Sequence, residues 1–232
     1  MINSPQHELA KWLTEILQPV VNKYSTFTVK DTFDFCGKLQ ECSDRCENIS
    51  ETFMCSFDIQ SLFTNVALKE TVQICLDVSY RDEEVSTLVM TADLLRKLLL
   101  KATTDVEFSF DNTLYKQIDR VAMGSPLGPA LANIFVGYLE SKIPDHNLPL
   151  LYCRFVDDTF SIFWENKSAF DFFSLLNQMH KNLQFTMETE TGVGYPSWMC
   201  TLRKKGMSCI GQFTGKKPLL VCIRAGSHFA LN

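Results

Sequence analysis

The sequence has no stretch approaching the roughly 18 uninterrupted apolar residues that a membrane-spanning helix needs. Its N-terminus has no basic segment followed by an apolar one, so neither a membrane anchor nor a secretory leader is expected. Paired Cys-x-x-Cys spacing is also missing. The 9 cysteines are scattered and odd in number, which favours reduced thiols in an intracellular protein. The cluster Cys36, Cys42 and Cys46 has no evident fourth ligand, so structural zinc is disfavoured there.

Positive charge is scarce as well, with 22 Lys and Arg against 27 Asp and Glu and a net charge of −5. Proteins that bind nucleic acids usually present a basic surface to the phosphates. The balance therefore argues against an autonomous nucleic-acid binder, or indicates that the basic parts of such a protein are missing from this chain. Apolar residues make up 46% of the sequence and aromatic residues 12%, which is ample for a buried core. The length of 232 residues allows one large domain or two small ones.

Apolar residues recur at three- and four-residue spacing in several segments, which predicts amphipathic helices. Helices are expected over 5–21, within 31–51, over 69–78 and 94–102, from the segment 124–129 to about 142, and over 168–182. Trp12 and Leu94 are expected on the inner faces of their helices. Strands are expected over 53–59, 151–156, 159–164 and 183–187, with a hairpin over 108–115. This mixture predicts an α+β fold, an antiparallel sheet with helices packed on one face.

Three acidic residues lie at the ends of strand-like runs. Asp58 ends the apolar start of one run, and the pair Asp157 and Asp158 separates two others. Aspartate is common in tight turns for local reasons, so the pair alone favours a structural interpretation. Two adjacent carboxylates repel each other, however, and a divalent cation relieves that repulsion. With Asp58 as a third ligand, the set suits two Mg²⁺ ions about 3.5–4 Å apart and phosphoryl transfer between them.

The segment 124–129 contains two glycines and two prolines, which guarantees an irregular backbone before the following helix. A plain loop is the simplest interpretation. A functional one is that glycine allows a base or sugar to approach closely, while Ser125 and the helix start contact phosphate. Taken together, the carboxylates and this loop predict the palm of a template-directed polymerase.

The order of the motifs resembles the reverse transcriptase of Penelope-like retroelements, a branch related to telomerase. The motifs, in chain order, are HELAKWL, SFDIQSLFTNV, FSFDNTLYKQ, AMGSPLGPALANIF, YCRFVDDTFSIFW and LQFTMETE, and the resemblance runs from about residue 4 to about residue 196. It implies a right-hand polymerase palm with a remnant of the fingers. It also implies an RNA-directed DNA polymerase that uses an RNA template, a DNA primer, deoxynucleoside triphosphates and two Mg²⁺ ions. A nuclear location is expected from the family.

The resemblance also assigns roles by position. Asp58 and Asp157 match the main metal-binding carboxylates of the family, and Asp158 matches their neighbour. Phe63 stands where reverse transcriptases place the bulky side chain that collides with a ribose 2′-hydroxyl. Without the family, an ordinary core aromatic is an equally good interpretation of Phe63.

The loop residues Gly124, Ser125, Pro126 and Gly128 match the segment that contacts the template and the incoming nucleotide. Phe155 stands where many relatives have tyrosine, and the loss of that hydroxyl is expected to leave metal binding intact.

The chain also departs from the family. The fingers segment that grips the triphosphate is expected upstream of this sequence, and a thumb and an endonuclease domain are expected to be missing. The domain is therefore expected to span 1–196. Residues 197–232 are expected to be a degenerate tail, because a one-nucleotide shift of reading frame can convert Ser197 to Cys200 into the Phe-Leu-Asp-Val that the family would continue with.

Two other functions stay open. One is a catalytically inactive remnant or a non-enzymatic interaction module that keeps the palm fold. The other is an unrelated palm-like nucleotidyl enzyme such as a cyclase, which is disfavoured because its signature residues are not seen in the sequence.

Overall fold

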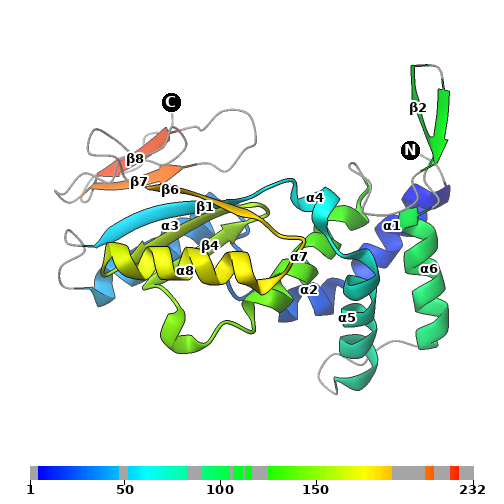
Figure 1. Cartoon of the computed structure of the whole chain (residues 1–232), viewed down its shortest axis with the longest axis horizontal. Helices are drawn as coiled ribbons and strands as arrows, with labels where there is room; N and C mark the ends of the chain where they lie inside the picture. Colours follow the sequence, from blue (N-terminus) through cyan, green and yellow to red (C-terminus); the bar gives the residue numbers. More distant parts are fainter. Residues whose placement is uncertain are drawn as a thin grey trace. The chain divides into compact units, whose positions relative to one another are not determined.

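The structure, a computed structural model, describes residues 5–46, 52–82, 90–104, 107–111, 113–116, 125–189, 207–211 and 220–224. The chain divides into two compact units, each assembled from separate stretches of sequence (Figure 1). Unit 1 comprises Met1–Phe27, Gln60–Ile143 and Met179–Gln184, and unit 2 comprises Thr28–Ile59, Pro144–Gln178 and Phe185–Asn232. The boundary expected at residue 196 lies outside the described residues.

Unit 2 is built on an antiparallel sheet of four strands in the order β4-β5-β1-β6. The strands are β1 (Phe53–Ile59), β4 (Leu151–Phe155), β5 (Asp158–Phe163) and β6 (Phe185–Thr189). Strand β1 has the bounds expected from the sequence, and β4 and β5 form the expected tight hairpin. Along β1 and β5 the register runs from Phe53 opposite Phe163 to Asp58 opposite Asp158.

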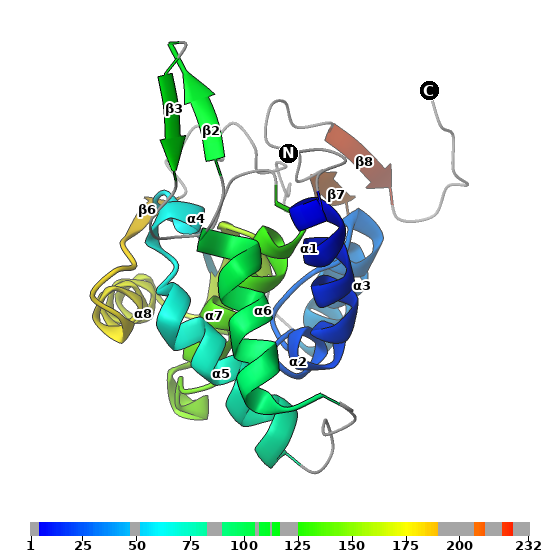
Figure 2. The same cartoon turned by 90° about the vertical axis from the view of Figure 1, so that its right-hand side faces the viewer.

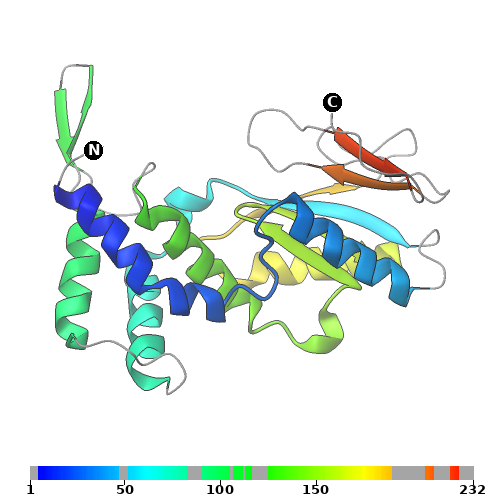
Figure 3. The ribbon, with the colours of Figure 1, turned by 180° about the vertical axis from the view of Figure 1, so that it is seen from behind.

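Helices cover both faces of this sheet, so the helix layer extends beyond the one face expected. On one face, Phe35 of α3 (Thr32–Arg45) meets the ring of Phe160 edge to face at 5.3 Å. On the other face, Phe172 of α8 (Asn166–Met179) contacts the rings of Phe57 at 5.8 Å and Tyr152 at 5.5 Å. Figures 1 and 3 show α8 and α3 from their respective sides. The reason is that strands β1, β4 and β5 bury side chains of both alternations, which only two covering layers can shield from water.

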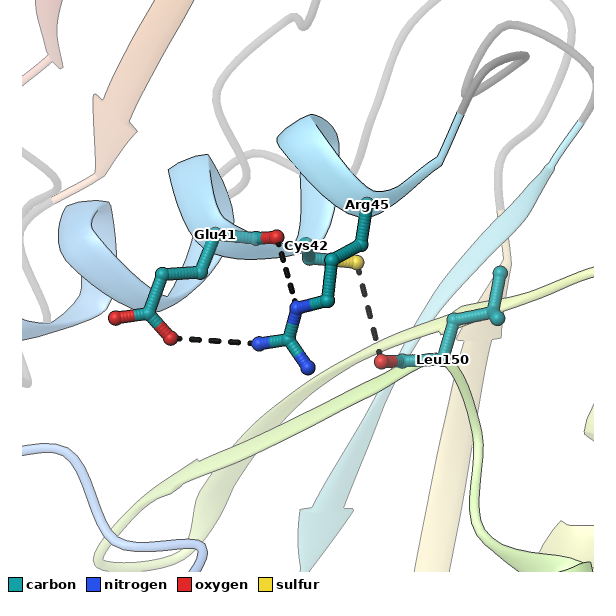
Figure 4. Close-up of polar contacts among 4 residues, drawn as sticks. All are labelled: Glu41, Cys42, Arg45 and Leu150. Atoms are coloured by element: carbon teal, nitrogen blue, oxygen red, sulfur yellow. Dashed lines mark hydrogen bonds and ion pairs between the residues drawn. The ribbon is translucent and has the colours of Figure 1, made fainter.

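Hydrogen bonds cap helix α3 and link it to the segment that precedes β4. The Asp31 carboxylate caps its N-terminus by accepting from the amides of Phe33 and Asp34, at 2.8 and 2.9 Å. Near the other end of α3, Cys42 Sγ donates to the carbonyl oxygen of Leu150 at 3.8 Å, just before β4 (Figure 4). The ion pair between Arg45 and Glu41 in the same view is exposed, and pairs of this kind contribute little stability.

Unit 1 is mainly helical (Figure 2). Its helices are α1 (Pro5–Ile16), α2 (Gln18–Lys23), α4 (Leu62–Asn65), α5 (Leu68–Arg81), α6 (Ala92–Thr104) and α7 (Leu127–Glu140). The hairpin expected over 108–115 is present as β2 (Glu107–Phe110) and β3 (Thr113–Lys116). Helix α7 is buried on nearly all sides, which fits its composition of apolar and small residues.

The single helix expected over 5–21 is two helices that meet at Leu17. Pro19 has no amide hydrogen and cannot continue the ladder of α1, but it is tolerated in the first turn of α2. Leu13, Leu17 and Val20 are buried as expected, whereas Trp12 is 43% exposed. Leu94, expected inside, is likewise 47% exposed at the start of α6.

A close approach joins α2 and α7 inside unit 1. A Cβ placed on Gly137 would collide with the carbonyl oxygen of Tyr24 and would lie 2.9 Å from its Cβ. The same region carries an edge-to-face contact between Tyr24 and Tyr138 at 5.7 Å, and Lys142 Nζ lies 3.9 Å from the Tyr138 ring centre. Glycine at 137 therefore lets the two helices touch through their backbones.

Two further strands lie in the C-terminal tail. Strands β7 (Met207–Gly211) and β8 (Leu220–Arg224) form an antiparallel pair. The rest of the segment 197–232 lies outside the described residues, and the expected frame shift stays a prediction.

A short 3₁₀ helix, η2 (Asp145–Asn147), precedes β4. None of the helices in the described residues combines the length and hydropathy needed to cross a membrane.

Candidate functional site

The three acidic residues singled out in the sequence meet at one end of the unit 2 sheet. Asp58 near the end of β1 lies directly opposite Asp158, the first residue of β5. Asp157 occupies the turn between β4 and β5, and its carbonyl oxygen accepts a hydrogen bond from the amide of Ile59 at 3.0 Å. Residues about a hundred positions apart in the sequence are thus brought side by side.

The turn that carries Asp157 is strained. Phe155 pairs with Asp158 across the hairpin, which leaves Val156 and Asp157 as a two-residue loop. Val156 has a φ of 60°, in the left-handed region that a β-branched residue rarely adopts. Backbone strain of this kind costs roughly 1–3 kcal/mol and persists only where surrounding contacts enforce it. The conformation of this loop is therefore held by its neighbours.

The electrostatics of this end of the sheet are unfavourable for negative charge. Burial raises the pKa of Asp58, and the charges of Asp157 and then Glu188 raise it further. Burial also raises the pKa of Asp158, to about 6, with contributions from Asp157, Asp58 and Glu188. The neighbouring charges that shift these two pKa values are all negative. A bound cation would lower both pKa values and relieve the repulsion.

Glu188 of β6 is a fourth carboxylate that the sequence reasoning missed. It lies opposite Ser56 of β1, while Asp58 lies opposite Thr186 of β6. Since side chains alternate along a strand, Glu188 shares a face of the sheet with Asp58. Glu188 directly follows the strand predicted over 183–187 and continues its alternation. Its place on the Asp58 face also depends on the pairing of β6 with β1, which the sequence alone does not provide.

The donor set fits a magnesium ion in its chemistry. Carboxylate oxygens are the ligands that Mg²⁺ prefers, and the ion needs only one or two of them because it keeps water and substrate oxygens. Among the described residues, no group of three or more His, Cys, Asp or Glu side chains is placed to hold a metal ion. This includes the described members of the cysteine cluster Cys36, Cys42 and Cys46. The fit to Mg²⁺ therefore rests on the chemistry of the carboxylate ligands.

A buried threonine joins the two strands that carry the carboxylates. Thr159 Oγ1 accepts a hydrogen bond from the amide of Phe57 and donates one to the carbonyl oxygen of the same residue, both at 2.9 Å. The side chain thus replaces a backbone pair in the ladder next to Asp58 and Asp158. It holds β1 and β5 in the register that places those two residues face to face.

Phe63 lies in unit 1 on the short helix α4 and is half-buried. The turn that leads into α4 contains Ser61 at a φ of 50°. Two side chains stabilise it, because Thr64 Oγ1 donates to the carbonyl oxygen of Ser61 at 2.9 Å and Asn65 Nδ2 donates to that of Gln60 at 3.0 Å. The partial exposure of Phe63 leaves its ring able to meet a ligand as well as the core.

The glycine- and proline-containing loop leads into α7, as expected. Gly124 lies outside the described residues. Ser125 is 3% exposed, and its hydroxyl has no hydrogen-bond partner among the described residues. Pro126 precedes the first turn of α7, and the amide of Gly128 donates to the carbonyl oxygen of Ser125 at 3.0 Å. A buried hydroxyl without a partner is costly, and a bound ligand is one way to satisfy it.

Unit 1 also contains a polar pocket of about 630 Å³ that the sequence did not predict. Its lining comes from Thr64–Glu70, His180–Asn182 and Gln184. His180 Nδ1 accepts from the amide of Asn182 at 3.1 Å, and Nε2 lies 3.1 Å from the Glu70 carboxylate. The His180 ring also packs edge to face on Phe135 at 5.0 Å. These contacts give His180 a structural role, because they link the segment His180–Asn182 to Glu70 of α5 and Phe135 of α7.

Solved telomerase structures share this fold. The apo telomerase of Candida tropicalis truncated from its C-terminal domain is 17% identical, with a TM-score of 0.59 over 84% of this chain and 42% of that chain. The telomerase of Candida albicans, in complex with the TWJ fragment of telomeric RNA, is 10% identical, with a TM-score of 0.62 over 87% of this chain and 37% of that chain. This chain spans about two fifths of the length of these telomerase chains. At these identities the similarity concerns the fold, and it confirms the expected palm.

No curated protein matches the sequence. The family of reverse transcriptases (RNA-dependent DNA polymerases), by contrast, matches residues 6–190, which is well over half of the chain. That range includes the acidic residues at the sheet end, Phe63 and the loop before α7. The chain therefore belongs to the reverse transcriptase (RNA-dependent DNA polymerase) family.

Proposed function

We propose that this chain is the palm of a reverse transcriptase from a Penelope-like retroelement, and that it adds deoxynucleotides to a DNA primer on an RNA template. The observation that carries the proposal is the placement of Asp58 opposite Asp158 with Asp157 in the adjoining turn. The order of the sequence motifs supports the narrower assignment to the Penelope-like branch.

In this proposal the acidic residues hold two Mg²⁺ ions. Asp58 and Asp158 would supply oxygens from facing strands, and Asp157 would supply them from the turn. Bound there, Mg²⁺ would supply activation of the attacking hydroxyl and neutralisation of the charge on the leaving group. The raised pKa values of Asp58 and Asp158 support this role, because a nearby positive charge would offset the burial and the negative charges that raise them.

Phe63 and the loop before α7 would select and orient the nucleotide. Phe63 would stand beside the sugar and exclude a ribose 2′-hydroxyl. Gly124, Ser125, Pro126 and Gly128 would line the site for the template and the incoming nucleotide, and the hydroxyl of Ser125 is a donor without a partner among the described residues.

Primer extension on poly(rA)/oligo(dT) tests the proposal. We expect the full chain to extend the primer with dTTP and Mg²⁺, and we expect chelation of the metal or Asp157→Asn to abolish extension. Asp171→Asn is the matched control, because Asp171 is exposed on α8 and should leave extension unchanged. A stably folded wild-type chain that never extends a primer would overturn the proposal.

Sugar selection tests the role of Phe63. We expect Phe63→Val to increase the use of ribonucleotides relative to deoxynucleotides by about tenfold or more, because the smaller side chain removes the clash with the 2′-hydroxyl. Tenfold corresponds to ~1.4 kcal/mol. A wild-type chain that already uses both sugars equally would contradict this role.

The second candidate is a palm that no longer catalyses. The net charge of −5 favours it, because an acidic chain holds nucleic acid poorly. It predicts a stable, cooperatively unfolding chain without extension under any metal. The same assay therefore separates the two candidates.

A further inference from the structure

Arg154 of β4 is a cation with no exposed surface, since its relative exposure is 0%. Moving a guanidinium out of water costs several kcal/mol unless hydrogen bonds replace its hydration. Such a residue persists in a sheet when its contacts hold something that the fold or the function needs. Its neighbours on the strand, Cys153 and Tyr152, are apolar or aromatic and buried, so the arginine is an exception within its own strand.

The guanidinium of Arg154 links two segments of unit 2. Nη1 donates to the carbonyl oxygen of Val156 at 3.1 Å, and Nη2 donates to Thr28 Oγ1 at 3.3 Å. The backbone of Arg154 is anchored at the same place, because its carbonyl oxygen accepts from the amide of Val29 at 2.9 Å. Val29 thus fixes the backbone of Arg154, and Thr28 fixes Nη2 of its guanidinium. Nη1 holds the turn through the carbonyl oxygen of Val156.

These bonds fix the backbone on both sides of Asp157. The carbonyl oxygen of Val156 belongs to the peptide group before Asp157, and Arg154 holds it. The carbonyl oxygen of Asp157 belongs to the peptide group after it, and the amide of Ile59 holds that one. With both peptide planes fixed, the direction of the Cα–Cβ bond of Asp157 is fixed as well.

The hydrogen bond from Arg154 to Val156 matters because the backbone of Val156 is strained. A valine at a φ of 60° would relax if the peptide group after it were free to rotate. That rotation would swing the Asp157 side chain away from Asp58 and Asp158. The hydrogen bond from Arg154 opposes it at the peptide group concerned.

We infer that Arg154 is a positioning residue: it fixes the peptide group before Asp157 and so directs the Asp157 carboxylate toward the proposed metal site, with Thr28 orienting the guanidinium. The inference rests on the proposed role of Asp157 as a metal ligand. Lysine cannot replace the arginine in full, because an ammonium group lacks the planar fork that reaches two fixed acceptors at once.

The inference can be tested without turnover by titrating the full chain with Mn²⁺ alone. Electron paramagnetic resonance monitors binding, because the signal of the free ion is lost when it binds. Residues that orient metal ligands typically affect metal affinity by about 10- to 100-fold. We expect Arg154→Lys to weaken binding by about tenfold and Arg154→Gln by up to about a hundredfold. Thr28→Val is nearly isosteric and removes only the orienting acceptor, so it should weaken binding by about threefold.

Arg45→Lys is the matched control, since Arg45 lies on α3 in the same unit with an exposed side chain (Figure 4). It should bind Mn²⁺ as the wild type does. Asp157→Asn should abolish the binding that the Arg154 variants weaken. Thermal unfolding of each variant gives its folded fraction, and the measured binding is expressed per folded chain. If an Arg154 variant does not fold, Thr28→Val still tests the inference.

The outcomes separate this inference from the proposed function. If folded Arg154→Lys and Thr28→Val bind Mn²⁺ as tightly as the wild type, the inference is wrong, while the proposed function can still stand on primer extension. If both variants weaken binding but the wild type never extends a primer, Arg154 positions a metal ligand in a chain that does not polymerise, and the proposed function fails alone.

Discussion

At the scale of single residues, the surroundings of Asp158 disfavour its ionised form. Its pKa is raised to about 6 by burial first, and then by Asp157, Asp58 and Glu188. The ordinary value for this carboxyl is 3.8. Between the two values the folded chain binds more protons than the unfolded chain, so the free energy of unfolding falls as the pH rises. This loss is complete above the folded-state pKa.

Asp158→Asn should therefore flatten the pH dependence of stability in the absence of divalent ions. From about pH 4 to pH 7 we expect the wild type to lose roughly 1 kcal/mol more than the variant, a figure reduced from the full linkage because solvent reaches this half-buried carboxyl. Urea unfolding at several pH values measures the difference. Mg²⁺ should restore stability to the wild type at pH 7 and not to the variant. Parallel pH profiles for the two proteins would contradict the raised pKa.

At the scale of elements, the pairing of β1 with β5 sets the geometry of the acidic residues. Thr159→Val keeps the shape of the side chain but removes the hydroxyl that bonds to both backbone groups of Phe57. We expect a loss of about 1–3 kcal/mol in the free energy of unfolding, because two backbone groups lose their partner inside the sheet. Ser161→Ala on the same strand is the control, since the Ser161 hydroxyl is buried without a partner among the described residues. Removal of that hydroxyl should be neutral or stabilising.

The contact between α2 and α7 is a second feature at this scale. Gly137→Ala places a methyl group against the backbone of Tyr24, which cannot move without displacing α2. We expect a destabilisation of about 1–3 kcal/mol, measured by urea unfolding. Gly37→Ala on α3 is the control, because a Cβ at that glycine has no atom within 4 Å. It should stabilise the chain by up to about 1 kcal/mol through helix propensity alone. Equal effects of the two substitutions would contradict the close approach.

The elements differ in how well the sequence predicts them. Strand β1 is predicted with its observed bounds, because a short aromatic run leading to Asp58 leaves few alternatives. The break between α1 and α2 is missed although Pro19 marks it, since the apolar spacing continues through the proline. Trp12 and Leu94 follow the apolar stripe and are nevertheless partly exposed, because periodicity identifies a face and not what covers it.

The candidate site is predicted in part for a similar reason. Motif order identifies Asp58, Asp157 and Asp158, and the structure brings them together at one end of the sheet. Arg154 is not identified, because its role depends on Thr28, which is 126 positions away in the sequence. Contacts of that range are set by strand pairing and packing, which a local pattern does not report.

At the scale of the whole chain, charge opposes nucleic-acid binding. With a net charge of −5, the chain offers little release of counterions from a duplex. We expect it to bind an RNA–DNA duplex more weakly than about 10 μM at 150 mM salt, and with a shallow dependence on salt. Fluorescence anisotropy with a labelled duplex measures both quantities. Submicromolar binding with a steep salt dependence would show a basic surface that the composition does not predict.

The most direct test of the catalytic assignment is the position of a bound metal ion. Crystals of the full chain soaked in Mn²⁺ give an anomalous signal that locates the ion independently of any assay. We predict density within about 2.0–2.3 Å of carboxylate oxygens of Asp58, Asp157 and Asp158. Manganese bound only elsewhere, with these carboxylates directed apart, would contradict the assignment.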